Sequence, residues 1–224
     1  GRVKAMILAA CRGERMRPLT DHQPKPLLRV GDKSLIERLV EALVQAGMPD
    51  IVINHAHLGH QIVEALGDGR CYAARIVYSH ESGGGLETGG GILQAMHLLD
   101  DPFLVVNGDI LTDFPFARLP TRLSGLAHLV MVDNPPHHPH GDFALIGRHL
   151  LAEGPERLTF SGVGVYAKAL FKGCVPGKFP LAPLLRAAMA RGAVTGEYYA
   201  GDWWDIGTPE RLQQLDDHYR DRAK

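Results

Sequence analysis

The sequence predicts an α/β fold built on a doubly wound, mostly parallel sheet, and two patterns indicate it. Short apolar runs alternate with segments whose apolar residues recur at helical spacing through the first half of the chain. Residues 3–10 form the first run, interrupted only by Lys4, as expected of a strand buried on both faces. Because such sheets bind ligands at the carboxyl ends of their strands, function is expected in the loops that follow them.

The first helix is predicted to begin after Ser34. Ser34 and Glu37 have the spacing of a capping box, and Gly47 provides a stop. Between these signals the apolar residues recur at helical spacing, so one face of the helix should pack against the sheet. They are Leu35, Ile36, Leu39, Val40, Leu43 and Val44.

Strands and helices continue to alternate along the rest of the first half. Strands are predicted over residues 50–54, 75–78 and 103–107, and helices over 58–66 and 88–99. The second half is more mixed, with strands over 127–132, 143–146 and 162–166 and helices over 181–191 and from Pro209 onward. Since no linker or internal repeat is visible, residues 1–224 are expected to form a single domain.

The composition excludes several classes of function. Of the 224 residues, 45% are hydrophobic and 22% charged, which suits a folded core rather than a disordered chain. The formal net charge of -1 offers no basic field for nucleic acid or an anionic membrane. With no apolar run long enough to span a membrane and no signal peptide, the expected location is the cytoplasm. The three cysteines are expected to be reduced thiols, and the sequence does not indicate an oligomeric state.

A basic, glycine-containing loop follows the first strand. Small residues at its start leave backbone N–H groups free to wrap a triphosphate, and an arginine, Arg12, Arg15 or Arg17, could neutralise its charge. A solvated basic turn is the alternative. Lys25 stands between two prolines, which restrict the positions that its ammonium group can take.

Two acidic positions are candidates for a metal site. Asp109 ends the sequence Asn107-Gly108-Asp109, directly after a predicted buried strand. Asp205 comes shortly before the last predicted helix, which it could instead cap. Magnesium prefers a few carboxylates together with phosphate oxygens and water, so two distant aspartates suit a metal that joins two phosphate groups.

Five motifs in a fixed order resemble the sugar-1-phosphate nucleotidyltransferase family. They are LAACRGERMRPLT, PKP, LETGGG, NGD and WDIGT, and the resemblance extends from Val3 to about Tyr219. It implies a Rossmann-like, GT-A-like architecture that transfers a nucleotide from a nucleoside triphosphate to a sugar 1-phosphate. It also implies a nucleotide-binding half over about residues 3–110 and a sugar-binding half over about 111–224. The chain would lack the C-terminal extension that many members carry.

The resemblance also implies a role for individual residues. Arg15 would lie near the outer phosphates, Lys25 near the reacting phosphates, and Asp109 and Asp205 would bind Mg²⁺. The remaining nucleotide-binding positions would be Leu8, Ala9, Ala10, Cys11, Arg12, Gly13 and Gly89. Asn107, Asp142 and Glu153 would contact the sugar phosphate, and Gly162 would line its pocket. The base would be read by residues 79–85.

Within the family, three short segments are most similar to the branch that transfers UMP from UTP to N-acetylmuramate 1-phosphate in peptidoglycan recycling. These are residues 53–56, 141–145 and 181–185. Mannose- and heptose-1-phosphate guanylyltransferases are the alternatives. One departure stands out: Cys11 occupies a position where the family has glycine, and its side chain could crowd the nucleotide or exclude the glycine φ. A non-catalytic nucleotide-sugar sensor is therefore a third alternative.

Two groups of histidines have a spacing that could bind a metal. His55, His57 and His60 form the first, and His137, His138 and His140 the second. We expect both groups to be surface or loop histidines instead.

Overall fold

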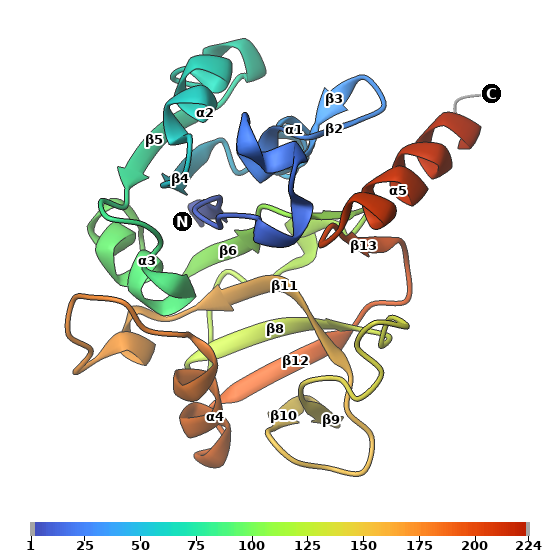
Figure 1. Ribbon diagram of the computed structural model, residues 1–224. Coiled ribbons are helices and arrows are strands. Elements are labelled where there is room, and N and C mark those ends of the chain that lie inside the picture. The colour runs from blue at the N-terminus through green and yellow to red at the C-terminus, as the bar shows by residue number, and fades with distance from the viewer. Residues whose placement is uncertain (1–2, 223–224) are drawn as a thin grey trace.

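The computed structural model describes residues 3–222, so residues 1, 2, 223 and 224 of the predicted domain lie outside the described residues. A nine-stranded sheet forms the centre, in the order β5-β4-β1-β6-β11-β8-β12-β10-β9. Its strands are β1 (Ala5–Leu8), β4 (Asp50–His55), β5 (Arg75–His80), β6 (Phe103–Asn107), β8 (Ala127–Val132), β9 (Ala144–Ile146), β10 (His149–Leu151), β11 (Thr159–Tyr166) and β12 (Val194–Tyr198). Figure 1 shows the first half of the chain at one end of this sheet and the yellow and orange segments at the other.

The first four of these strands in the sheet order run parallel. β1 pairs with β4 on one side and β6 on the other, and Leu8 stands beside both Asn54 and Asn107. β11 joins β6 and β8 as an antiparallel strand, and β10 is antiparallel to both its neighbours. The remaining strands all point one way, which confirms the predicted mostly parallel sheet.

Helices cover both faces, as the doubly wound prediction requires. Side chains on β1 alternate between two cores: Ala5 and Ile7 face α1 (Leu35–Gln45) and α2 (Gly59–Leu66), whereas Met6 faces α3 (Glu87–Ala95) and α4 (Ala182–Ala190). The capping box of α1 is present, since Glu37 N donates to Ser34 Oγ and Ser34 N donates to the Glu37 carboxylate.

Smaller elements complete the molecule beside the sheet. β7 (Ile110–Thr112) pairs with β13 (Trp203–Asp205), and β2 (Arg29–Val30) pairs with β3 (Lys33–Ser34). The last helix, α5 (Pro209–Arg222), returns to lie against β2, and Figure 1 shows its red ribbon near the blue hairpin. Leu215 of α5, Ile206 and Val30 share a third apolar cluster. Short 3-10 helices occupy Glu14–Met16, Leu19–Asp21, Lys25–Leu27, Arg70–Tyr72, Met96–Leu98, Phe116–Arg118 and Lys168–Phe171.

Two details of the predicted elements need correction. The helix predicted from residue 88 begins at Glu87, and its last predicted turn is the separate 3-10 helix Met96–Leu98. The sequence did not predict strands β2, β3, β7, β10, β12 and β13, because each is short or carries polar residues on a partly exposed face. Among the described residues, no helix is both long enough and apolar enough to cross a membrane.

Candidate active site

The loop after β1 is compact and held from within. Gly13 has a φ of 69°, and a Cβ there would stand 3.1 Å from Thr20 Cγ2 and 3.3 Å from Lys25 Cβ, so only glycine fits without strain. The Thr20 hydroxyl donates to the Gly13 carbonyl at 2.8 Å. These contacts set the distance between the loop and Lys25.

The three arginines of this loop have different surroundings. Arg12 donates to the Thr20 carbonyl, and Arg17 pairs with Asp21 at 3.1 Å, so both hold the loop together. Arg15 is exposed, and its guanidinium lies beside Gly207, where a Cβ would stand 3.1 Å from an Arg15 nitrogen. Arg15 is thus the arginine that faces the segment after β13.

Cys11 is exposed and is not among the described residues with positive φ. The concern that its backbone needs a glycine conformation is therefore wrong for this chain. Whether the thiol affects a bound nucleotide stays a prediction.

Lys25 is the buried cation of the site. It is 5% exposed, and its Nζ lies 2.9 Å from Asp109 Oδ2. The proline on each side fixes the short 3-10 turn in which Lys25 sits. Asp109 follows β6, so the ion pair stands at the carboxyl edge of the parallel strands.

The second aspartate is brought to the first by the β7–β13 pair. Asp205 is the last residue of β13 and pairs with Ile110, while Ile206 N donates to the Asp109 carbonyl at 2.8 Å. Asp205 does not cap α5: Arg211 N donates to Thr208 Oγ1 at 3.3 Å, so Thr208 takes that place. His137 Nε2 lies 2.9 Å from Asp205 Oδ2.

The donor set at this edge suits a hard divalent cation that also binds phosphate. Among residues 3–222, no group of three or more His, Cys, Asp or Glu side chains gathers to hold a metal alone. Two carboxylates on adjoining segments, each partly exposed, leave the other coordination positions to water and phosphate oxygens, as Mg²⁺ prefers.

The residues expected near the sugar phosphate fall into three places. Gly162 has a φ of 87° at a bulge in β11, and a Cβ there would stand 2.6 Å from Asn107 Nδ2, so these two residues are in contact. Asp142 accepts a hydrogen bond from Phe160 N at 2.8 Å and shares one with His138 Nε2 at 2.9 Å. Glu153 is exposed just beyond β10.

The three glycines Gly89, Gly90 and Gly91 lie inside the first turns of α3 and are buried. A Cβ on Gly89 would stand 2.4 Å from the Phe179 ring, and one on Gly90 would stand 2.1 Å from the Gly177 carbonyl. Gly89 therefore lets α3 pack closely on the segment before α4, and its role toward a nucleotide stays a prediction.

Several polar residues at the same edge were given no individual role from the sequence. Asn54 and Glu81 are buried and join the loop after β1 to the loop after β5. In the sequence each is only a polar residue at or just after the end of an apolar strand, and that pattern does not show which group it will hydrogen-bond. His137 and His138 were expected to be surface or loop histidines rather than metal ligands, and each contacts one predicted site carboxylate.

The first group of histidines is also placed differently from the prediction. His55 is 8% exposed, not on the surface, and its ring packs against Tyr78 and His80. Burial, and then the nearby His80, lower the pKa of His55. His57 Nε2 contacts the Thr20 carbonyl at 2.8 Å and so supports the loop after β1.

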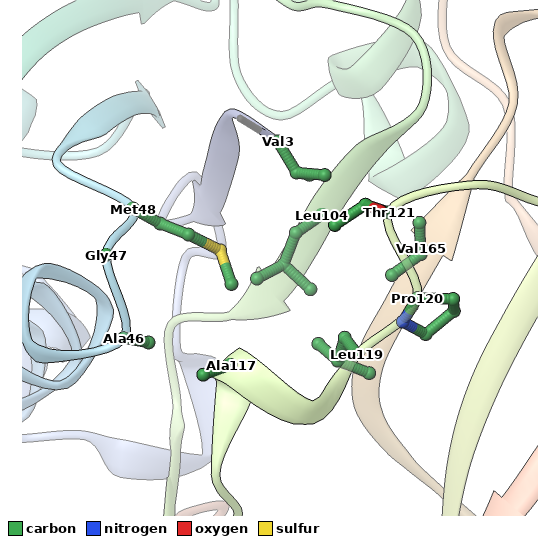
Figure 2. Close-up of a pocket in the computed structure, with 10 residues that line it drawn as sticks. All are labelled: Val3, Ala46, Gly47, Met48, Leu104, Ala117, Leu119, Pro120, Thr121 and Val165. Atoms are coloured by element: carbon green, nitrogen blue, oxygen red, sulfur yellow. The ribbon is translucent and has the colours of Figure 1, made fainter. Parts of the chain in front are cut away.

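One cavity lies away from this site. Its volume is about 200 Å³, and Figure 2 shows its apolar lining, which includes Val3, Met48, Leu104 and Leu119. Val3 and Met48 precede β1 and β4, so the cavity is at the amino ends of the strands, opposite Lys25 and Asp109. It contributes nothing to the arrangement described above.

The chain is similar to proteins of one known family over most of its length. A family described as "Nucleotidyl transferase" matches residues 4–153, which include the loop after β1, Lys25, Asp109 and Asp142. The chain belongs to this nucleotidyl transferase family. Nucleotidyl transferases with whole-chain similarity include a Neisseria meningitidis protein, 52% identical over 95% of this chain and 96% of its own, and a Caulobacter vibrioides protein, 34% identical over 92% of each. Both are named N-acetylmuramate alpha-1-phosphate uridylyltransferase.

Other nucleotidyl transferases match over less of their length. A Dictyostelium discoideum mannose-1-phosphate guanylyltransferase catalytic subunit beta is 39% identical over 52% of this chain, which is 33% of its own length. Among solved structures, a Bacillus anthracis protein crystallised with sucrose has a TM-score of 0.88 at 22% identity, covering 98% of this chain and 96% of its own. At this level of identity the likeness shows a shared fold and nothing about activity.

Proposed function

We propose that the chain transfers UMP from UTP to N-acetylmuramate 1-phosphate, giving UDP-N-acetylmuramate and pyrophosphate. The observation that carries the choice of substrates is the 52% identity, over 96% of its length, to a relative with that name. The buried Lys25–Asp109 pair beside Asp205 supports nucleotidyl transfer, because two polyanions must meet where positive charge is fixed in advance. Peptidoglycan recycling in the cytoplasm is the setting that fits this reaction.

We further propose that residues 1–224 act as one domain with two functional parts. Residues 3–110 would bind the nucleotide and residues 111–224 the sugar. The nine-stranded sheet runs through both parts without interruption across β6 and β11, which supports a single unit.

The nucleotide would lie over the carboxyl ends of the parallel strands. The loop of residues 8–13 would bind its phosphates through backbone N–H groups other than that of Ala9, which donates to Asn54 Oδ1. Arg12 would support that loop, and Gly89 would lie close to the nucleoside. Arg15, exposed beside Gly207, would neutralise the outer phosphates that leave as pyrophosphate. Lys25 is held at 2.9 Å from Asp109 and would stabilise the charge that develops on the transferred phosphate.

The sugar phosphate would enter from the second half of the sheet. Asn107 and Asp142 would bind it, with Glu153 at the edge of the pocket and Gly162 leaving room beside Asn107. One phosphate oxygen of the sugar would attack the α-phosphorus, and the bond to pyrophosphate would break on the opposite side. Because the attacking group is already an anion, no residue has to remove a proton from it.

Asp109 and Asp205 would hold Mg²⁺, which when bound supplies positive charge to the reacting phosphates. Each carboxylate already has a partner on this chain that keeps it in place, Lys25 for Asp109 and His137 for Asp205. These partners would limit the movement of the carboxylates when the cation binds.

A pyrophosphate-release assay with Mg²⁺ tests the proposal. It crosses UTP, GTP, dTTP and CTP with the 1-phosphates of N-acetylmuramate, N-acetylglucosamine and mannose. Turnover confined to UTP and N-acetylmuramate 1-phosphate is expected. A preference for GTP with mannose 1-phosphate would instead assign the chain to the guanylyltransferases, one of which matches 52% of this chain. A folded chain that binds UTP but releases no pyrophosphate would be a sensor.

A further inference from the structure

Two buried polar side chains lie behind the nucleotide loops and have no part in the chemistry described above. Asn54, on β4, is 3% exposed, and Glu81, directly after β5, is 2% exposed. No ion pair joins Glu81 to a cation among residues 3–222. A buried carboxylate is costly unless hydrogen bonds compensate for the water that it loses, so its partners indicate why it is there.

Hydrogen bonds through these two side chains link one loop to the other, and donation from both ends converges on Glu81. Ala9 N donates to Asn54 Oδ1 at 2.8 Å, and Asn54 Nδ2 donates to Glu81 Oε2 at 2.7 Å. Leu86 N then donates to Glu81 Oε1 at 2.8 Å. Both ends are backbone N–H groups, which can only donate. Asn54 must therefore accept on one side and donate on the other, and Glu81 must accept with both oxygens.

The two ends of this chain of bonds are the two loops that would enclose the nucleotide. Ala9 belongs to the loop after β1, and Leu86 closes the loop after β5. The loops already face each other, since a Cβ on Gly85 would stand 3.5 Å from the Ala10 carbonyl. Gly91 leaves space for the pair, because a Cβ there would stand 2.6 Å from Glu81 Oε2.

We propose that Asn54 and Glu81 are positioning residues that hold these two loops at a fixed separation, so that UTP enters a preformed site. This inference rests on the proposed function. Glu81 lies within residues 79–85, the segment expected to read the base, but it is 2% exposed and Asn54 is 3% exposed, so both act through the backbone of Leu86 and Ala9. A site that is ordered in advance loses less conformational entropy when its ligand binds.

A swap of the two side-chain types tests the proposal. In Glu81→Gln, an amide NH₂ must face either Asn54 Nδ2 or Leu86 N, both of which are donors. In Asn54→Asp, two carboxylates face each other. In the double variant N54D/E81Q, the new amide at position 81 donates to the new carboxylate at position 54, and both backbone N–H groups keep their acceptors. The swap preserves the shape, the total charge and the number of bonds.

We expect each single variant to raise the KM for UTP, and its dissociation constant measured by calorimetry, about tenfold. The KM for the sugar phosphate and the kcat at saturation should change much less. The double variant should return both UTP constants to within about threefold of the parent. Glu64→Gln is the matched control: it makes the same acid-to-amide change at an exposed position of α2, outside the chain of bonds, so its UTP constants should not change.

Three results would overturn the inference: single variants with the parent affinity for UTP, a double variant no better than the singles, or losses that follow the melting temperature alone. If a single variant does not fold, Glu81→Asp takes its place. Its carboxylate keeps both acceptor oxygens on a side chain that is one methylene shorter, and the same increase in the UTP constants is expected. Failure of the proposed function is separate, because calorimetry needs no turnover. A parent chain that binds UTP without reacting leaves the test intact, and one that does not bind UTP overturns both proposals.

Discussion

At the scale of single residues, the burial of Lys25 distinguishes it from the other cations near the site. Its ammonium is almost enclosed, with Asp109 Oδ2 as an ionic partner, whereas Arg15 is exposed. A fixed charge in such a place needs little rearrangement when a phosphate arrives. The aspartates beside it are partly exposed, as a ligand-binding carboxylate has to be.

Replacing either aspartate should greatly slow turnover while the fold is kept. For Asp109→Asn and Asp205→Asn we expect kcat to fall by on the order of a hundredfold or more, because each change removes charge from the proposed cation site. Asp100→Asn is the control, since Asp100 pairs weakly with Lys4 at 3.9 Å on the surface. The measurement is pyrophosphate release with circular dichroism on the same samples, and near-normal rates in both variants would refute the assignment.

Cys11 should prove tolerant of change. Its backbone does not occupy the positive-φ region and its side chain is exposed, so Cys11→Gly is expected to alter kcat and the KM for UTP by less than about threefold. The kinetic constants of the two proteins check this directly. A large gain of activity in the glycine variant would mean that the thiol obstructs the nucleotide.

At the scale of elements, the start of α1 carries a pH-dependent contribution to stability. Burial alone would raise the pKa of Glu37, but hydrogen bonds from Ser34 and from Tyr72 outweigh it and hold the pKa below 4.5. The stabilisation is therefore present above pH 4.5 and lost as the pH falls through the lowered pKa of the folded state. Glu37→Gln should lower the free energy of unfolding at pH 7, and the difference should shrink towards pH 4.

Urea unfolding of both proteins at pH 7 and pH 4 measures this difference. Glu64→Gln, an exposed change on α2, serves as the control and should have no effect at either pH. Removing the other half of the same cap with Ser34→Ala should cost about 1 kcal/mol at pH 7. An equal loss from Glu37→Gln at both values would show that its charge is not involved.

The loop between β8 and β9 connects the two proposed subsites. Its neighbouring histidines diverge, His137 to Asp205 and His138 to Asp142. The Asp142 carboxylate is held on one oxygen by His138 and on the other by Phe160 N. His138→Gln should therefore leave it held on one side only and raise the KM for the sugar phosphate about fivefold, with the KM for UTP unchanged. His140→Gln, an exposed change in the same loop, is the control. An increase in the KM for UTP instead would place Asp142 elsewhere in the mechanism.

Periodicity predicted the elements that bury a whole face and failed for the others. The capping box of α1 and the strand over 103–107 were correct because local signals determine them. β12 was not predicted, because a glycine and a glutamate interrupt its apolar pattern, and only its place between β8 and β10 makes it a strand. The packing role of Gly89 in α3 could not be predicted, because it depends on Phe179, a residue distant in the sequence.

At the scale of the whole molecule, the candidate site draws on both ends of the chain. Motifs could predict Lys25, Asp109 and Asp205 one by one, but not the bond from Ile206 to the Asp109 carbonyl that brings the last two together. Nor could they predict the partners of Asn54 and Glu81, because hydrogen bonds between loops depend on the register of neighbouring strands.

Binding of UTP should therefore stabilise the entire fold. At a free concentration 100 times its dissociation constant, a ligand adds about 2.7 kcal/mol, and for a chain of this size that corresponds to a melting temperature about 5–10 °C higher. Thermal unfolding with UTP and Mg²⁺ measures the shift. Uridine, which lacks the phosphates, should give little of it, and an equal shift with uridine would show that the phosphates are not bound.

The β7–β13 pair has a consequence for how the protein is made. One proposed cation ligand is synthesised before the middle of the chain and the other near its end. Because synthesis proceeds at about 5–20 residues per second, β1, β4, β5 and β6 can assemble on the ribosome well before β13 emerges. A nascent chain with its nucleotide loops already formed would thus still be unable to catalyse the transfer. It could do so only after β13 and α5 had been synthesised and had folded.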